Sequence, residues 1–246
     1  MKKIILIPVR LNSKRLPSKA LLKLDNLPLI IHTYKRACLS KYADEVYVCT
    51  DSERIIKVCI NFSVKYIKTK SVHRNGTERI AEAAKKLRLN KKDIIIDVQG
   101  DEPLIDPKNI DQTIKFHLKN DYEIVVPHLK INKLTDKNIV KIISVKNNVK
   151  WMTRKNIPFF KNFNKVSFKK HLSIITFNFN SIIKFSKIKP SIHEKLESIE
   201  LLRAIENNFK IGTLELNGDS FSIDVLRDYH RAINYIKKDI IKRNYI

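Results

Sequence analysis

The sequence predicts an α/β protein with a mainly parallel central sheet flanked by helices. Short apolar runs rich in β-branched residues alternate with segments of helical spacing, and 246 residues are enough to bury a substantial core. The apolar runs are 3–9, 44–50, 64–68 and 93–99, and the helical segments between them include 28–39 and 77–89. Such alternation is typical of βαβ units, whose strands are parallel.

The second half of the chain continues this pattern with more strands. Strands are predicted at 123–131, 138–146 and 171–179, an amphipathic helix at 192–208, and a last helix at 226–242. No internal repeat, low-complexity linker or sharp change of composition divides the chain. We therefore expect a single domain over 1–246 that carries a smaller subregion.

Charge and composition leave two interpretations open. The formal net charge is +24, which can indicate a nucleic-acid or other polyanion partner. The lysines are scattered, however, and accompany abundant Ile and Asn and only 4 Gly, as an AT-biased genome would produce. We favour solvated lysines over nucleic-acid binding. Three cysteines without metal or disulfide spacing, and apolar runs too short for a signal peptide or membrane span, predict a cytoplasmic protein without membrane insertion.

Polar residues follow the predicted strands at positions where ligands commonly bind. In open parallel sheets, ligands collect beyond the carboxyl ends of the strands. Arg10 follows the first strand, Thr50 ends the second, and "VQGDEP" (98–103) ends the fourth. These three strand ends could lie along one edge of the sheet.

The loop after the first strand is unusually rich in cations. Arg10, Arg15 and Lys19 could clamp a polyphosphate through charge-assisted hydrogen bonds. The loop contains no glycine, so it is neither a Walker A loop nor a dinucleotide fingerprint. The alternative is an exposed basic turn, and the loop alone does not decide between the two.

A possible second ligand contact lies at 75–78. Asn75 and Glu78 have the spacing of a capping box at the start of a helix. Asn75, Gly76 and Thr77 would then offer free backbone N–H groups to a base or a phosphate. An ordinary helix cap, without any ligand, explains the pattern equally well.

The turn after the fourth strand offers carboxylates for a metal. Asp101 and Glu102 follow Gly100, and Mg²⁺ needs only one or two protein carboxylates when phosphate and water complete its shell. Asp224 lies at a later junction with a helix, where Asp is also a common N-cap. A plain polar turn remains the alternative at 99–103.

The second half has weaker candidates. Glu194, Glu197 and Glu200 are spaced by three, which would place them along one side of a helix, either as a solvated face or as part of a site. His171, in an otherwise apolar strand, could bind a sugar hydroxyl or be a structural histidine.

Taken in order, these segments resemble the 3-deoxy-manno-octulosonate (KDO) cytidylyltransferases, also called CMP-KDO synthetases. The family pattern "IPAR", "S-T-R-L-P-G-K", "ATD", "H-x-SGTER-AE" and "VNVQGDEP" is met by "IPVR", "SKRLPSK", "CTD", "HRNGTERIAE" and "IDVQGDEP" between residues 7 and 103. The resemblance continues more weakly through "NIVKII", "TRKNIP", "KHLSI", "PSIHEKLESIELLR" and "SIDV". It therefore covers nearly the whole chain.

The resemblance implies a nucleotide-diphospho-sugar transferase (glycosyltransferase-A-like) fold, usually dimeric. Its members join CTP and KDO into CMP-KDO and diphosphate for lipopolysaccharide synthesis, with Mg²⁺ as cofactor. The implied division is a nucleotide-binding part at about 1–125, a sugar-acid-binding and dimerisation part at about 126–222, and a C-terminal helix at 223–246.

The resemblance also implies the roles of individual residues. Arg10, Arg15 and Lys19 would hold the CTP phosphates and, with Asp101, form the catalytic group, while Asp101 and Asp224 would bind Mg²⁺. Near the nucleotide or in the sugar-acid pocket would lie Thr50, Asn75, Gly76, Gln99, Arg154, His171, Glu194, Glu197 and Glu200. Lys14 stands where the family has Thr, and we expect no role for it.

The sugar half departs from the family pattern and keeps other acceptors open. A family Tyr is Ile175 here, an Arg is Asn178, and a Gln is Leu201, and in the nucleotide half a family Gly is Ser18. Each lost hydrogen-bond partner of a hydroxylated sugar costs on the order of 1 to 3 kcal/mol of binding free energy when the remaining polar group stays buried and unpaired. A related sugar acid, of sialic or 8-amino type, or a homologue that binds CTP but turns over poorly, therefore remains an alternative.

Overall fold

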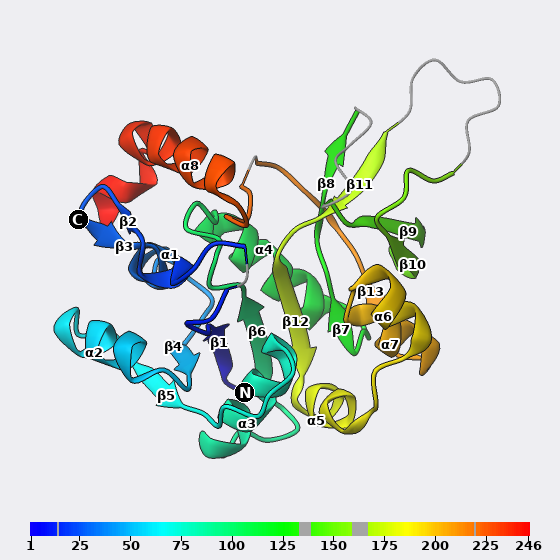
Figure 1. The fold of residues 1–246 in the computed structure, drawn as a ribbon. Helices are drawn as coiled ribbons and strands as arrows, with labels where there is room; N and C mark the ends of the chain where they lie inside the picture. The colour runs from blue at the N-terminus through cyan, green and yellow to red at the C-terminus, as the bar shows by residue number, and fades with distance from the viewer. Residues whose placement is uncertain (14, 133–138, 159–166, 219) are drawn as a thin grey trace.

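The computed structural model describes residues 1–13, 15–132, 139–158, 167–218 and 220–246, and these residues form an α/β fold. Its sheet has twelve strands among the described residues, in the order β14-β8-β11-β9-β10-β13-β7-β12-β6-β1-β4-β5. Helices cover the sheet on both sides (Figure 1). The predicted fold class, with a central sheet flanked by helices, is confirmed.

The first half consists of parallel strands joined through helices. The strands are β1 (Lys3–Pro8), β4 (Glu45–Thr50), β5 (Tyr66–Lys68) and β6 (Ile94–Val98), and they pair in parallel in the order β6-β1-β4-β5. The helices are α1 (Leu29–Ala37), α2 (Glu53–Asn61), α3 (Gly76–Lys86) and α4 (Pro107–Lys119). A small hairpin of β2 (Lys23–Leu24) and β3 (Leu27–Pro28) and a 3-10 helix at Lys19–Leu21 precede α1.

Beyond β6 the sheet is mixed rather than parallel. The strands are β7 (Ile124–Val125), β8 (His128–Ile131), β9 (Lys141–Val145), β10 (Asn148–Thr153), β11 (Phe168–His171), β12 (Ile174–Asn178), β13 (Ile211–Gly212) and β14 (Glu215–Leu216). β12 runs antiparallel to β6, and β9 and β10 form an antiparallel hairpin. Lys146, in the two-residue turn between β9 and β10, has φ 51°, as short hairpin turns require. The parallel arrangement therefore holds for the βαβ part, where helices join the strands.

Besides the last helix, three predicted elements are divided in the structure. The predicted helix 192–208 is two helices, α6 (Ile192–Glu197) and α7 (Leu201–Glu206), because Ser198 adopts a left-handed conformation with φ 53°. The predicted strand 171–179 is divided between the end of β11 and β12. The strand 123–131 is β7 and β8, separated at Pro127, which cannot donate a backbone hydrogen bond.

The C-terminal region packs back on the first half. α5 (Phe179–Lys187) follows β12, and α8 (Leu226–Lys238) ends the chain together with a 3-10 helix at Ile241–Asn244, instead of the single helix predicted to 242. Arg36 of α1 pairs with Asp239 after α8, and the hydroxyl of Tyr245 lies 2.9 Å from Nδ1 of His32. These contacts fix α8 beside α1.

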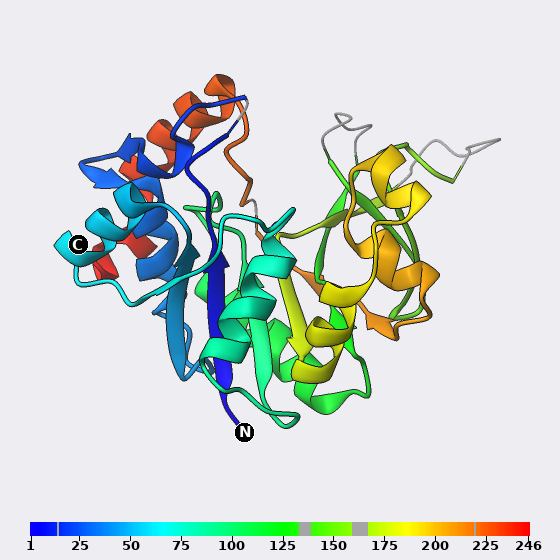
Figure 2. The ribbon, with the colours of Figure 1, turned by 60° about the horizontal axis from the view of Figure 1, so that its bottom comes forward.

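The core occupies both faces of the sheet. Ile4 and Leu6 pack towards α3 and α5, whereas Ile5 and Ile7 pack towards α1, α2 and α4. Figure 2 shows α3 and α5 in front of β1, β6 and β12. Because these four side chains are at most 1% exposed, β1 is buried on both faces, as expected for a parallel sheet covered by helices. In the described part of the chain, no helix combines the length and apolar character needed to cross a membrane.

Candidate active site

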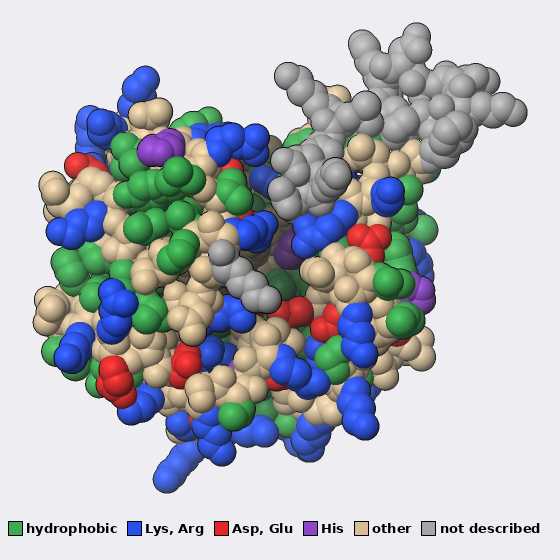
Figure 3. All heavy atoms as spheres, viewed as in Figure 1, with side chains coloured by type: hydrophobic (Ala, Val, Ile, Leu, Met, Phe, Trp, Pro, Cys, Tyr) green, Lys and Arg blue, Asp and Glu red, His purple; other side chains and the backbone are tan. Residues whose placement is uncertain are grey.

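A pocket of about 560 Å³ lies at the carboxyl ends of β1 and β6. Figure 3 shows the hollow on the face of the molecule where cationic and acidic side chains border it. Predicted residues that line it are Arg10, Arg15, Lys19, Asn75, Gly76, Gln99, Asp101, Glu200 and Asp224. The structure therefore brings most of the predicted nucleotide residues together and adds one glutamate from the second half.

The basic loop enters the pocket from the end of β1. Arg15 has a side chain that is 53% exposed, whereas the Lys19 side chain is only 15% exposed. Lys19 starts the short 3-10 helix, and Ser18 before it adopts φ 51°, a conformation that glycine favours. Ser18 thus keeps the backbone conformation that a glycine in the family pattern would accommodate without strain. Lys14 lies outside the described residues.

Lys19 joins the two predicted metal-binding carboxylates. Its Nζ lies 2.6 Å from Oδ2 of Asp101 and 3.2 Å from Oδ1 of Asp224. Arg15 also contacts Asp224, with 3.0 Å between Nη2 and Oδ1. Asp101 and Asp224 are far apart in the sequence, yet they are close enough to share one cation. This donor set fits Mg²⁺, which takes a few carboxylates and completes its shell with phosphate and water oxygens.

Glu102 does not join this group of carboxylates. The side chain is 2% exposed, and Glu102 is absent from the residues that line the pocket. Of the two acidic residues at the end of β6, only Asp101 faces the cations. In the described part of the chain, no group of three or more His, Cys, Asp or Glu side chains is arranged to hold a metal. A metal here would thus depend on phosphate oxygens for much of its shell.

The N-terminus of α3 forms the opposite wall. Asn75 caps the helix as predicted, with Oδ1 accepting a hydrogen bond from the N–H of Glu78 at 2.9 Å. The Glu78 carboxylate accepts instead from Arg74, so the reciprocal half of the predicted capping box is absent from this pair. A Cβ on Gly76 would lie 3.1 Å from Cγ of Pro8. The glycine therefore allows α3 to approach the end of β1 closely.

Thr50 lies beneath the pocket rather than in its wall. Its side chain is fully buried, and Oγ1 accepts a hydrogen bond from the N–H of Ser52 at 3.2 Å. Asp51 pairs with Arg79, at 2.9 Å between Oδ1 and Nη2, and Arg79 does line the pocket. Sequence reasoning did not single out Arg79, nor His73 and Arg74, although all three lie within the quoted "HRNGTER" motif.

Gln99 is held by a buried carboxyl group. Its Nε2 donates to Oδ2 of Asp97 at 2.8 Å, and Asp97 is fully buried in β6. Burial, together with the nearby Glu200, raises the pKa of Asp97 well above its usual value. With one N–H of its amide bonded to Asp97, Gln99 can offer a ligand its carbonyl oxygen as an acceptor and its second N–H as a donor.

Only one of the three predicted glutamates reaches the pocket. Glu200 lies between α6 and α7, and its Oε2 accepts a hydrogen bond from Oγ1 of Thr77 at 2.7 Å. Burial raises the pKa of Glu200. The interpretation of Glu194, Glu197 and Glu200 as one helical stripe is wrong, because the left-handed Ser198 separates Glu200 from the other two.

Four of the predicted sugar-acid residues do not line this pocket: Arg154, His171, Glu194 and Glu197. Glu194 is 8% exposed and binds the fully buried Arg203, with 2.7 Å between Oε2 and Nε. Glu197 accepts from the backbone N–H of Arg154 at 2.9 Å, while Nε of Arg154 donates to the Glu197 carbonyl at 2.8 Å. His171 ends β11, and burial lowers its pKa to about 4.

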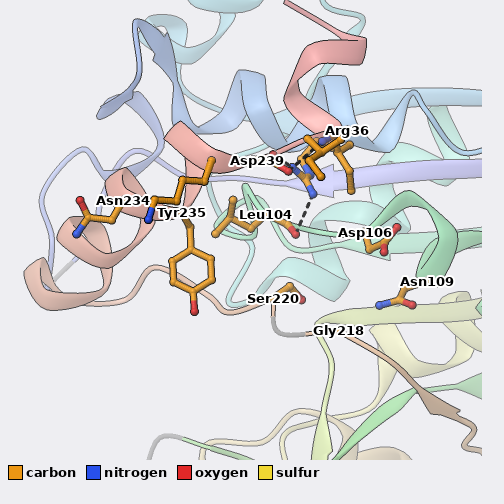
Figure 4. Close-up of a pocket in the computed structure, with 12 residues that line it drawn as sticks. Arg36, Leu104, Asp106, Asn109, Gly218, Ser220, Asn234, Tyr235 and Asp239 are labelled. Atoms are coloured by element: carbon orange, nitrogen blue, oxygen red, sulfur yellow. Dashed lines mark hydrogen bonds and ion pairs between the residues drawn. The ribbon is translucent and has the colours of Figure 1, made fainter.

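A second cavity, of about 580 Å³, is lined by residues of α1, α4 and α8 together with Gly218 and Ser220. Figure 4 shows Arg36, Leu104, Ser220, Tyr235 and Asp239 around it. Arg36 there donates to the carbonyls of Ile105 and Leu104 and pairs with Asp239, so its guanidinium is engaged inside the protein. None of the predicted site residues lines this cavity.

Comparison with known proteins agrees with the motifs in the pocket. The sequence profile of the cytidylyltransferase family matches residues 4–211. A 3-deoxy-manno-octulosonate cytidylyltransferase of Thermodesulfovibrio yellowstonii is 40% identical over 93% of this chain and 96% of its own length. The chain belongs to the 3-deoxy-manno-octulosonate cytidylyltransferase family. A Fusobacterium nucleatum relative of the same name is 36% identical over 98% of this chain and the whole of that protein.

Structural comparison and a further relative refine the family assignment. A CMP:2-keto-3-deoxy-manno-octonic acid synthetase solved with CTP superposes with a TM-score of 0.90, at 27% identity, over 97% of this chain and 99% of that one. An 8-amino-3,8-dideoxy-manno-octulosonate cytidylyltransferase of Shewanella frigidimarina is 34% identical over 94% of this chain and 97% of its own length.

The residues of the sugar half that differ from the family pattern fit into the structure as a helix cap and as core residues. Asn178 caps α5, with Oδ1 accepting from the N–H of Ser181 at 2.9 Å. Leu201 is 3% exposed and Ile175 is 8% exposed, and both belong to the core that packs around α3 and α5. Each changed residue therefore has a structural role in this chain.

Proposed function

We propose that this protein transfers CMP from CTP to 3-deoxy-manno-octulosonate and releases diphosphate. The observation that carries this proposal is the convergence of Arg15, Lys19, Asp101 and Asp224 beside the end of β1, in a pocket that Arg10 also lines. Family membership and the match to a relative solved with CTP support the choice of nucleotide.

The cations in this pocket suit a triphosphate. Arg10 and Arg15 can form paired hydrogen bonds to phosphate oxygens, and Lys19 can act as a point charge. Asp101 and Asp224 would hold Mg²⁺, which would withdraw charge from the phosphate oxygens during the reaction. In the structure Lys19 neutralises the two carboxylates, and we propose that it turns to the phosphates when Mg²⁺ and CTP bind.

In the proposed reaction a hydroxyl oxygen of the sugar acid forms a bond to the α-phosphorus. The bond between that phosphorus and the diphosphate oxygen breaks, diphosphate leaves with the bonding electrons, and the hydroxyl proton passes to solvent. The cationic side chains neutralise the charge that accumulates on the leaving diphosphate. The protein thus contributes positioning and charge and needs no nucleophilic side chain.

A closely related acceptor is the second candidate. Relatives with 34–35% identity are 8-amino-3,8-dideoxy-manno-octulosonate cytidylyltransferases. The carboxyl of Glu200 and the carbonyl oxygen of Gln99 are hydrogen-bond acceptors, so this wall suits hydroxyl or ammonium groups of a ligand. This chemistry accommodates either sugar acid.

A turnover assay across acceptors tests the proposal. Diphosphate release from CTP is measured with 3-deoxy-manno-octulosonate, with its 8-amino analogue and with a sialic acid, using Asp101→Asn as the inactive control. We expect the highest kcat/KM with 3-deoxy-manno-octulosonate. Turnover only with the amino sugar would replace the first candidate by the second, and no CTP-dependent turnover with any acceptor would refute both.

We also propose that the protein is a cytoplasmic homodimer. Support comes from exposed apolar side chains on α6 and at the end of β9: Ile192, Leu196 and Val145 are 64%, 75% and 61% exposed. Burying such residues against a second copy would remove them from water. Light scattering should give the mass of a dimer for the protein and a smaller mass for Leu196→Lys, and a monomer in both cases would contradict the proposal.

A further inference from the structure

The two carboxylates of the pocket come from irregular segments rather than from helices or strands. Asp101 lies in the turn after β6, and Asp224 lies in the extended segment before α8. The N–H of Ile223 donates to the carbonyl of Asp101 at 3.0 Å, which brings the two segments together. The N–H of Asp224 also donates to Oδ2 of Asp228 at 3.1 Å, but that bond lies within the C-terminal region and does not join the two segments.

Glu102 supplies a second link between the same segments. Its Oε1 accepts a hydrogen bond from Oγ of Ser222 at 2.6 Å, and Ser222 lies two residues before Asp224. Only 2% of Glu102 is exposed, so water cannot readily compete for this contact. Losing this contact would leave the buried Oε1 of Glu102 without its partner from Ser222, which costs more than losing an exposed contact.

We propose that Glu102 is a positioning residue that holds Asp224 opposite Asp101 through Ser222. The proposal rests on the function proposed above, in which these aspartates share a divalent cation. Glu102 acts through the serine and not on a ligand, because it does not line the pocket. With the backbone bond from Ile223, its contact restrains the two consecutive residues that precede Asp224.

The same segment is also tied to the second half of the molecule. Oγ of Ser173, between β11 and β12, lies 3.4 Å from Oγ of Ser222, and Nζ of Lys170 donates to the carbonyl of Ser220 at 3.1 Å. Ser222 is therefore the point where the turn after β6, the segment before α8 and the β11–β12 connection meet. Removing the Ser222 hydroxyl removes its contacts with Glu102 and Ser173 without altering the pocket wall.

Four variants separate positioning from a general structural effect. Glu102→Ala and Ser222→Ala each remove the link, whereas Glu102→Gln keeps a side-chain oxygen that can accept from Ser222. Ser220→Ala is the matched control, because its buried Oγ has no hydrogen-bond partner among the described residues. The probe is Mn²⁺, whose binding in the presence of CTP is followed by electron paramagnetic resonance, together with kcat, KM for the sugar acid, and the melting temperature.

We expect Glu102→Ala and Ser222→Ala to weaken Mn²⁺ binding about tenfold, which corresponds to 1.4 kcal/mol, and to lower kcat while KM for the sugar acid stays unchanged. Glu102→Gln should recover most of the Mn²⁺ affinity, and Ser220→Ala should match the wild type. Ser222→Ala decides the matter if Glu102→Ala fails to fold.

Unchanged Mn²⁺ affinity in Ser222→Ala, or a lower melting temperature with unchanged Mn²⁺ affinity in both variants, would overturn the positioning role. Failure of the proposed function has a different signature, since the wild type itself would then show neither CTP-dependent Mn²⁺ binding nor turnover.

Discussion

The two halves of the molecule use their charged side chains differently. In the nucleotide half, Lys19 and Arg15 meet Asp101, and Asp224 from the segment before α8, in the wall of an open pocket. In the second half, Glu194 is bound to Arg203 inside the protein. The first arrangement can exchange its partners for a ligand, whereas the second stabilises the fold. Charged residues in a predicted motif therefore indicate a ligand site only where a ligand can replace their protein partners.

The largest effect is expected from breaking the internal pair of the second half. Glu194→Ala removes the carboxylate that is hydrogen-bonded to the fully buried Arg203 guanidinium, and Glu78, at 3.9 Å, is too far away to replace that hydrogen bond. The loss should cost about 3–5 kcal/mol of folding free energy. Urea unfolding measures this loss. Glu206→Ala is the matched control, because Glu206 pairs with the half-exposed His193 and the loss should stay below about 1 kcal/mol. Equal losses in the two variants would show that Glu194 has no special structural role.

The corresponding change in the nucleotide half should affect turnover and leave stability nearly unchanged. Lys19→Ala removes the ammonium placed between Asp101 and Asp224, and we expect kcat/KM for CTP to fall by about 10²–10³-fold. Lys23→Ala, an exposed lysine on the neighbouring β2, serves as control. A Lys19→Ala enzyme with wild-type turnover would remove Lys19 from the proposed phosphate site.

A smaller effect concerns acid sensitivity in the second half. His128 of β8 is 3% exposed, and burial lowers its pKa to about 4, below the ordinary value of 6.5. Between these values the unfolded chain binds a proton that the folded protein does not, so stability falls as the pH drops from 6.5 towards 4. At pH 5 this histidine should lower the free energy of unfolding by roughly 2 kcal/mol relative to neutral pH.

Replacing His128 tests this assignment. His128→Gln should lose less stability than the wild type between pH 7 and pH 5, as measured by urea unfolding at both values. Nδ1 of His128 lies 2.8 Å from Oγ1 of Thr213, and glutamine replaces the titrating ring there by a neutral polar group. Identical losses in both proteins would show that another group is responsible for the acid sensitivity.

The same contrast explains what the sequence could predict. Arg10, Lys19, Gln99 and Asp101 follow buried parallel strands, and the ends of such strands meet at one edge of the sheet. The alternation of strands and helices in the sequence was therefore enough to predict that these residues lie close together. Asp224 follows no long strand, and only its resemblance to the family pattern indicated that it joins Asp101.

The second half was harder to predict for physical reasons. The helix break at Ser198 is made by a serine with φ 53°, without the glycine or proline that usually marks such a turn. The inward direction of Glu194 depends on Arg203, which belongs to a different helix of the divided pair. Periodicity describes one helix at a time and cannot show that two short helices place these side chains against each other.

Titration of CTP with and without Mg²⁺ tests the central claim, that Asp101 and Asp224 hold the metal that helps to bind the triphosphate. Isothermal calorimetry compares the wild type with Asp101→Asn and Asp224→Asn. The account predicts that chelating Mg²⁺ weakens CTP binding to the wild type at least tenfold and leaves both variants, already weak with Mg²⁺, nearly unchanged. Wild-type CTP affinity that does not depend on Mg²⁺, or variants that retain the full Mg²⁺ effect, would contradict it.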